Sequence, residues 1–200
     1  MSWSEILGFV AGAVSVWLYV RQNVWAWPTG IANSVFWLIL FFGARLYLDA
    51  SLQVVYIGLG IAGWIWWVRG RRDGGRRSGD LPVARTGRGE ALVLLAIGAS
   101  ATAGLWWAMT RIADAAPLPD AATTVVSLIA QYMLTRKLLA NWYLWIAVDV
   151  AYVVLYAYKG LYLTAALQPL FIALCVLGLR DWRATMPRKT TVDTPEAVTA

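Results

Sequence analysis

The sequence predicts an all-α integral membrane protein of seven transmembrane helices, built from two parallel three-helix repeats that one extra helix joins. Of its 200 residues, 60% are hydrophobic, and the mean hydropathy is +0.60. A soluble domain of this size could not bury so much apolar surface, whereas a bilayer accepts it. Residues 46–67 also match residues 161–182 at 10 of 22 positions without a gap, at a constant offset of 115. Such internal repeats are typical of transporters, which place a site between the repeats.

Seven apolar stretches have the length, or nearly the length, of a span. Two of them are short for a hydrocarbon core of ~30 Å at ~1.5 Å per residue. The breaks between them carry turn chemistry, such as Trp27-Pro28 at the start of the second stretch. The predicted spans are residues 4–21, 26–42, 46–68, 90–110, 120–136, 140–158 and 161–182.

The duplication covers three spans on each side of the fourth. Trp17 and Arg21 fall opposite Tyr132 and Arg136 at the offset of 115, and residues 23–27 resemble residues 141–145 at an offset of 118. The larger offset predicts a small length difference in the second helix of each repeat. Because three helices carry the chain across the membrane, a second triplet points the same way only if one helix first returns the chain. Spans 1–3 and 5–7 are therefore predicted to be parallel repeats.

The basic residues orient the predicted bundle. Of the 17 Lys and Arg residues, 14 fall on the side opposite the N-terminus, in span ends, the linker or the tail, and only Arg45, Arg111 and Lys159 fall on the N-terminal side. The positive-inside rule then predicts an external N-terminus and a cytoplasmic C-terminus.

The linker of residues 69–88 carries seven arginines without interleaved aromatic residues. We interpret it as a solvated cytoplasmic loop that can touch anionic lipid headgroups, not as a nucleic-acid site. The predicted organisation is a first three-helix repeat (1–68), this basic linker (69–88), a linker helix with the fourth span (89–116), a second repeat (117–183) and a disordered cytoplasmic tail (184–200).

Four polar side chains lie at one depth in four different spans. Asn33, Gln53, Asp149 and Gln168 each lie about seven to nine residues inside a span, roughly 10–14 Å from the interface at ~1.5 Å per residue. Polar side chains at this depth are costly and usually face a cavity or each other. They therefore predict a polar chamber near the middle of the bilayer.

Aromatic residues accompany these polar groups. The sixth span carries one helical stripe at spacings of 3, 4, 3 and 4, formed by Trp142, Trp145, Asp149, Tyr152 and Tyr156. Trp37 follows Asn33 in the second span, and Tyr56 follows Gln53 in the third. The predicted substrate-binding residues are Trp142, Trp145, Asp149, Gln53, Asn33, Gln168, Trp37, Tyr56 and Tyr152.

Several of these residues also have a simpler interpretation. Gln53 and Gln168 could hydrogen-bond neighbouring helices, which contributes ~1 kcal/mol in membranes. Trp142 could be an interfacial anchor, and the three tryptophans within residues 64–67 are interpreted as such belt residues. Asp149 is harder to explain structurally, because a carboxylate at mid-depth costs ~2.5–3.5 kcal/mol and has no intramembrane Lys or Arg partner in the sequence.

The composition argues against a membrane enzyme. The chain has no His and one Cys, Cys175, inside an apolar run. The sequence therefore lacks the ligands for a zinc or haem site and the His of a Cys-His catalytic pair. A single intramembrane carboxylate also cannot form an acid–base pair. No cofactor and no metal are expected. A scaffold or sensor that binds a ligand without moving it is the remaining alternative class.

Four segments together carry a family resemblance: RQNVWAWPTGI, ARLYLDASLQVVY, NWYLWIAVDVAYVVLY and YKGLYLTAALQ. With them, the chain resembles the PnuC-type vitamin transporters over all seven spans, and only the linker and the tail after about Arg183 are unmatched. The W-x-x-W motif of that family, with a following Asn or Asp, matches Trp142, Trp145 and Asp149, and its helix-three Gln region matches Gln53.

The resemblance implies a 3+1+3 fold related to the sugar-transporting SWEET proteins, in the inner membrane of a bacterium. It also implies facilitated uptake of nicotinamide riboside for NAD synthesis by alternating access, with a cytoplasmic nucleoside kinase trapping the substrate. Sister groups with this architecture carry thiamine or riboflavin, so the fold alone does not decide the substrate. The expected partners are this small molecule and the lipid bilayer, and the question of a homo-oligomer stays open.

Physical chemistry favours a flat cation without deciding among these vitamins. Nicotinamide riboside has a flat cationic ring, which Trp faces attract by stacking and cation–π interaction, ~2 kcal/mol or more when desolvated. Asp149 can neutralise this ring or accept hydrogen bonds from the ribose. Thiamine is also a flat cation, whereas riboflavin is neutral and larger. Asp149 could instead carry a proton, but no chain of ionisable residues spans the bundle to relay it, so uniport is expected.

Overall fold

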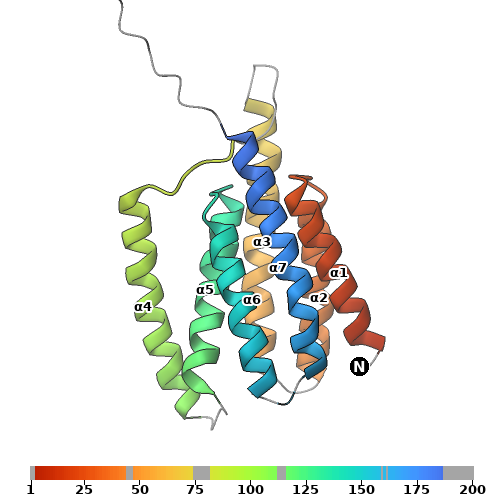
Figure 1. Ribbon diagram of the computed structural model, residues 1–200, viewed down its shortest axis with the longest axis vertical. Coiled ribbons are helices and arrows are strands. Elements are labelled where there is room, and N and C mark those ends of the chain that lie inside the picture. The colour runs from red at the N-terminus through yellow and green to blue at the C-terminus, as the bar shows by residue number, and fades with distance from the viewer. Residues whose placement is uncertain are drawn as a thin grey trace, which may run out of the picture.

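The computed structural model describes residues 3–43, 47–73, 82–111, 116–158, 160 and 162–186, and these residues form seven α-helices (Figure 1). The helices are α1 (Trp3–Val20), α2 (Ala26–Gly43), α3 (Tyr47–Asp73), α4 (Arg88–Thr110), α5 (Pro117–Thr135), α6 (Asn141–Tyr158) and α7 (Tyr162–Thr185). The prediction of seven helices is confirmed. The largest difference in bounds is at α3, which continues to Asp73 into the predicted linker.

The chain reverses direction at every connection, so α1, α3, α5 and α7 run one way and α2, α4 and α6 run the other (Figure 1). α2 packs against α1 and α3, and α6 packs in the same manner against α5 and α7. We call α1–α3 the first triplet and α5–α7 the second triplet. Further contacts of α1 with α7 and of α3 with α5 join the two triplets. Among the described residues, α4 packs against α5 alone, at the edge of the bundle (Figure 1).

One end of the bundle carries most of the arginines whose positions are described, and we call it the basic end. The C-terminal ends of α1, α3, α5 and α7 and the N-terminal end of α4 lie there (Figure 1). Its described arginines are Arg21, Arg69, Arg71, Arg72, Arg85, Arg88, Arg136, Arg180 and Arg183.

Four of the described helices, α2, α3, α4 and α7, are long and apolar enough to cross a membrane by themselves. Within the residues described, α1 contributes a shorter apolar stretch, Leu7–Val20. α5 and α6 carry buried polar residues, among them Ser127 and Asp149, that the bundle encloses. In contrast, α4 exposes large apolar side chains such as Leu95 and Trp107, as a lipid-facing helix does.

Two tryptophans pack on two glycines in the same way in the two triplets. Trp27 at the start of α2 lies against Gly63 of α3, and Trp142 at the start of α6 lies against Gly178 of α7. Both indoles are buried, and a Cβ on either glycine would overlap the ring. Both pairs keep the offset of 115. The predicted offset of 118 is therefore wrong, because the second helices need no length difference.

A second pair of tryptophans joins the triplets at the basic end. Trp67 Nε1 donates a hydrogen bond to the Thr135 carbonyl oxygen at 3.2 Å, and Trp182 Nε1 donates to the Tyr19 carbonyl oxygen at 3.1 Å. Each indole thus supplies a donor to the last turn of the first helix in the opposite triplet, where carbonyls lack helical partners. Trp67 is only 2% exposed. Its interpretation as a belt residue is therefore wrong.

The basic linker is not a solvated loop throughout. Val83 is buried and belongs to the same hydrophobic cluster as Trp67. The Ala84 amide donates to the Lys137 carbonyl oxygen at 3.1 Å, and the Leu139 amide donates to the Ala84 carbonyl oxygen at 2.9 Å. These backbone hydrogen bonds tie the linker to the α5–α6 connection. Residues 74–81 of the linker and residues 187–200 of the predicted tail lie outside the described residues.

Candidate functional site

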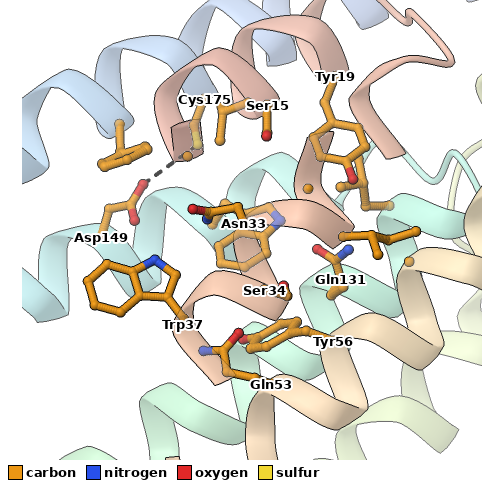
Figure 2. Close-up of a pocket in the computed structure, with 18 of the residues that line it drawn as sticks. Ser15, Tyr19, Asn33, Ser34, Trp37, Gln53, Tyr56, Gln131, Asp149 and Cys175 are labelled. Carbon is orange, nitrogen blue, oxygen red and sulfur yellow. Dashed lines mark hydrogen bonds between the residues drawn. The ribbon is translucent and has the colours of Figure 1, made fainter. Parts of the chain in front are cut away.

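A cavity lies between the two triplets and is lined by every helix except α4 (Figure 2). Its volume of about 360 Å³ is within the ~300–1,000 Å³ that is typical of small-molecule sites. All nine residues predicted from the sequence line this cavity, namely Asn33, Trp37, Gln53, Tyr56, Trp142, Trp145, Asp149, Tyr152 and Gln168. The structure therefore brings the predicted set together in one place.

Each triplet contributes a stacked aromatic pair from its second helix. The ring centroids of Trp37 and Phe41 lie 5.4 Å apart with planes at 26°, and those of Tyr152 and Tyr156 lie 5.1 Å apart at 16°. Trp37 and Tyr152 line the cavity, so stacking on their partners holds these two rings in place. Trp145 lines the cavity seven residues before Tyr152, on the same face of α6. These rings offer flat apolar surfaces to an aromatic ligand.

Asp149 places a carboxylate in this aromatic surrounding. Its side chain is 7% exposed, and Cys175 Sγ donates a hydrogen bond to Oδ2 at 3.6 Å (Figure 2). A thiol is a weak donor, so the carboxylate keeps most of its capacity to accept hydrogen bonds. None of the described residues that line the cavity is Lys or Arg. Because a buried charge without a counter-charge is costly, this arrangement suits a ligand that carries a positive charge.

Amide and hydroxyl groups supply the rest of the polar surface. Asn33 Oδ1 is buried and accepts no hydrogen bond from the described part of the chain. Gln53 of α3 and Gln168 of α7 line the cavity at positions 115 apart. The Tyr56 hydroxyl is hydrogen-bonded to Ser127 Oγ at 2.6 Å, which fixes its ring. Asn33 therefore has the clearest unmet capacity for a ligand, since buried acceptors are normally satisfied.

Trp142 contributes to the cavity mainly as part of the hydrophobic core. It is 2% exposed, lies against Gly178, and meets Trp182 edge to face with ring centroids 5.3 Å apart. Its Nε1 is buried and has no hydrogen-bond partner among the described residues. The alternative of an interfacial anchor is wrong for Trp142, because the bundle encloses the whole indole.

The structure adds cavity residues that the sequence did not single out. Those with polar side chains include Ser15, Tyr19, Ser34 and Cys175. Ser15 and Tyr19 follow Gly12 on α1 at spacings of 3 and 4. This spacing puts a glycine and two polar side chains on one face of the helix, a pattern from which a cavity-facing side could have been predicted. Ser34 stands 115 residues before Asp149, and aligning the second helices at that offset would have found it. Within the described ranges, no three His, Cys, Asp or Glu residues come together to hold a metal ion.

Known proteins resemble this chain along most of its length. The sequence profile of a family described as nicotinamide mononucleotide transporter matches residues 2–184. The chain is 26% identical over 204 residues to the nicotinamide riboside transporter PnuC of Escherichia coli (strain K12), covering 91% of this chain and 85% of that protein. It is 28% identical over 181 residues to the riboflavin/roseoflavin transporter RibM of Streptomyces davaonensis, covering 90% and 84%. A crystal structure of the vitamin B3 transporter PnuC has the same fold, with a TM-score of 0.72 at 19% identity over 92% of this chain and 82% of that one.

Proposed function

Because the chain belongs to the nicotinamide mononucleotide transporter family, we propose that it is a uniporter for nicotinamide riboside. The family consists of membrane transporters, not enzymes, and nicotinamide riboside is the substrate named for PnuC of Escherichia coli. In this proposal the vitamin crosses the inner membrane of a bacterium by facilitated diffusion. A cytoplasmic nucleoside kinase then traps it by phosphorylation, and the product feeds NAD synthesis.

The observation that carries the substrate proposal is the buried Asp149 carboxylate among aromatic rings, in a cavity whose described lining has no Lys or Arg. The pyridinium ring of nicotinamide riboside is flat and positively charged. Trp37 and Trp145 can take this ring against their faces, where a desolvated cation–π contact contributes ~2 kcal/mol or more. Asp149 then supplies the counter-charge that the ring needs in a buried site.

The polar groups of the cavity match the rest of the molecule. Asn33 Oδ1, which is buried and unpartnered, can accept a hydrogen bond from the carboxamide of the substrate. Gln53 and Gln168 each offer both a donor and an acceptor to the ribose hydroxyls. The binding roles of the nine predicted residues are part of this proposal, with Trp142 as a wall residue.

We propose that the two triplets are parallel repeats and that transport proceeds by alternating access between them. Pairs of residues 115 apart hold like positions in the two triplets, as Trp27 and Trp142 do, and the cavity lies between the triplets. Two parallel repeats have a pseudo-two-fold axis along the membrane normal, so rocking one against the other can open a central site to either side.

The same proposal makes the basic end cytoplasmic, with the N-terminus outside and the C-terminus inside, in keeping with the positive-inside rule. Buried residues fill this end of the bundle. Trp67 and Trp182 have ring centroids 6.1 Å apart, and Lys137 Nζ donates to Gln22 Oε1 at 3.0 Å. Release of the vitamin into the cytoplasm therefore requires these contacts to separate.

Riboflavin is the second candidate substrate, because the chain is as similar to RibM (28% identity) as to PnuC (26%). Riboflavin is larger and neutral, so the Asp149 charge gives it no advantage. Thiamine is a flat cation that would gain from the same carboxylate. Competition between the three vitamins separates these possibilities.

The test is uptake of radiolabelled nicotinamide riboside into proteoliposomes. We expect saturable uptake that unlabelled nicotinamide riboside suppresses, that excess riboflavin or thiamine leaves largely intact, and that persists when the pH gradient is collapsed. Stronger competition by riboflavin or thiamine would reassign the substrate. Loss of uptake without a pH gradient would make the protein a proton-coupled transporter, and binding without uptake would make it a sensor.

A further inference from the structure

A second cavity opens on the outer surface of the bundle, between α4 and the α5–α6 pair. Its volume is about 420 Å³, and its lining is almost entirely apolar. Its lining comes from α4 between Ala91 and Thr102, from α5 between Val125 and Met133, and from Thr86, Ala140 and Leu144. This groove is separate from the central cavity, because the two share no lining residue.

The groove exists because α4 touches the bundle along one line only. At Gly98 the helices approach closely, since a Cβ there would lie 2.9 Å from Ile129 Cδ1. Among the described residues α4 makes no helix contact with α6, and Figure 1 shows it at the edge of the bundle. Ala140 and Leu144 of the α6 side therefore face α4 across a space that the protein does not fill.

The length of the groove matches one leaflet of a bilayer. On α4 its lining runs from Ala91 to Thr102, which is about 17 Å at ~1.5 Å per residue. Half of a ~30 Å hydrocarbon core is about 15 Å. Because α4 begins at the basic end, the groove spans the leaflet on that side.

The groove has positive charge and an unpartnered hydroxyl at the end that lies toward the basic end of the bundle. Thr86 lines the groove, and its Oγ1 is buried without a hydrogen-bond partner in the described part of the chain. Arg85 and Arg88 lie on either side of it in the sequence, and both are exposed. Basic groups beside an apolar pocket at a membrane surface are complementary to the phosphate of an anionic lipid.

We propose that this groove binds an anionic phospholipid of the basic-side leaflet, with one acyl chain between α4 and the α5–α6 pair and the phosphate at Thr86 between Arg85 and Arg88. A second copy of this chain fits less well. A helix is ~10–12 Å wide, so a space of about 420 Å³ would hold about one turn of it. The lipid fills the gap beside α4 and so holds this helix against the repeats.

The experiment compares lipids on purified, delipidated protein in an uncharged detergent. Phosphatidylglycerol and phosphatidylcholine with identical chains are added separately, the melting temperature is measured, and native mass spectrometry counts the bound lipids. We expect phosphatidylglycerol to raise the melting temperature more, with one tightly bound molecule per chain. We expect the Arg85→Gln/Arg88→Gln variant to lose this preference. The control Arg180→Gln removes a charge from α7, which also ends at the basic end of the bundle, and should retain the preference.

Ala99→Phe provides a test of the groove itself, because Ala99 is exposed and a phenyl ring there fills the space without entering the core. We expect it to abolish tight binding of both lipids. The proposal is overturned if both lipids act equally on the wild type, if the double arginine variant keeps the preference, or if inorganic phosphate alone reproduces the effect of phosphatidylglycerol. A change of oligomer mass in Ala99→Phe with lipid binding intact would assign the groove to a second copy instead.

Discussion

Lys137 Nζ donates a hydrogen bond to Gln22 Oε1 at 3.0 Å, and the two residues stand 115 positions apart in the sequence. Both have left-handed backbone conformations, with φ of 50° at Lys137 and 52° at Gln22. The bond therefore links the α5–α6 connection to the α1–α2 connection at matching positions. Lys137 is 1% exposed, and its Nζ lies 4.4 Å from the centroid of the Trp67 ring. In the proposed cycle this contact breaks when the basic end opens.

Lys137→Met should favour the state that is open at the basic end. The substitution keeps an apolar chain but removes a charged donor, and hydrogen bonds to charged groups contribute ~1.5–3 kcal/mol. We expect Cys175, the single cysteine of the chain, which lines the central cavity, to react at least about tenfold faster with a membrane-impermeant thiol reagent supplied at the basic end. Arg136→Gln, a charge loss at the exposed neighbour, is the control. Equal labelling rates in wild type and Lys137→Met would contradict a role in closure.

Gly63→Ala and Gly178→Ala should destabilise the protein to similar extents. In each case the new methyl group meets a buried indole, Trp27 or Trp142, whose flat ring cannot bend away. Overpacking of this kind costs ~1–3 kcal/mol. Gly104→Ala on α4 is the matched control, because nothing lies within 4 Å of a Cβ there. The measurement is thermal unfolding in detergent, and unchanged melting temperatures in the first two variants would show that the packing is looser than described.

Trp37→Ala and Trp145→Ala should each weaken binding of nicotinamide riboside while the protein still folds. Both rings line the cavity, and loss of a desolvated cation–π contact of ~2 kcal/mol corresponds to roughly 30-fold in affinity. Trp107→Ala removes an exposed indole on α4 and should leave affinity unchanged. Titration calorimetry gives the dissociation constants. Affinities equal to wild type in both cavity variants would exclude stacking as the mode of recognition.

Gln53→Ala and Gln168→Ala distinguish ligand binding from helix–helix hydrogen bonding. If the amides bind the ribose, each variant loses roughly 2- to 12-fold in affinity, since a net hydrogen bond contributes ~0.5–1.5 kcal/mol, and keeps its melting temperature. If they hold helices together instead, the melting temperature falls and affinity is retained. We expect the first pattern, and both quantities are measured on the same preparations.

The sequence predicted the helices and the chamber because both depend on patterns that the membrane enforces. Polar residues such as Asn33 and Gln168 are rare at mid-depth, and their shared depth was enough to place them in one cavity. Trp145 and Tyr152 followed from the helical stripe that contains Asp149. The long apolar runs and the turn residues between them predicted where each helix lies along the chain.

What the sequence missed depends on tertiary packing. Trp67 looked like a belt residue because it lies near a span end, yet the contact between triplets buries it. Ala84 pairs through its backbone with the α5–α6 connection, and no side-chain pattern in a basic linker signals such pairing. The offset of 118 aligned Trp27 with Trp145, whereas packing on Gly63 and Gly178 pairs Trp27 with Trp142.

The most direct measurement is calorimetric titration of wild type and Asp149→Asn with nicotinamide riboside, riboflavin and thiamine. The Asn side chain keeps the shape and removes the charge, so any change in affinity reports the pairing of carboxylate and cationic ring. We predict that the wild type binds nicotinamide riboside most tightly and that Asp149→Asn weakens this binding about 10- to 150-fold, the range that ~1.5–3 kcal/mol implies. Two results would contradict recognition of the cationic ring by the Asp149 carboxylate. One is undiminished binding of nicotinamide riboside by Asp149→Asn, and the other is tighter binding of neutral riboflavin than of nicotinamide riboside by the wild type.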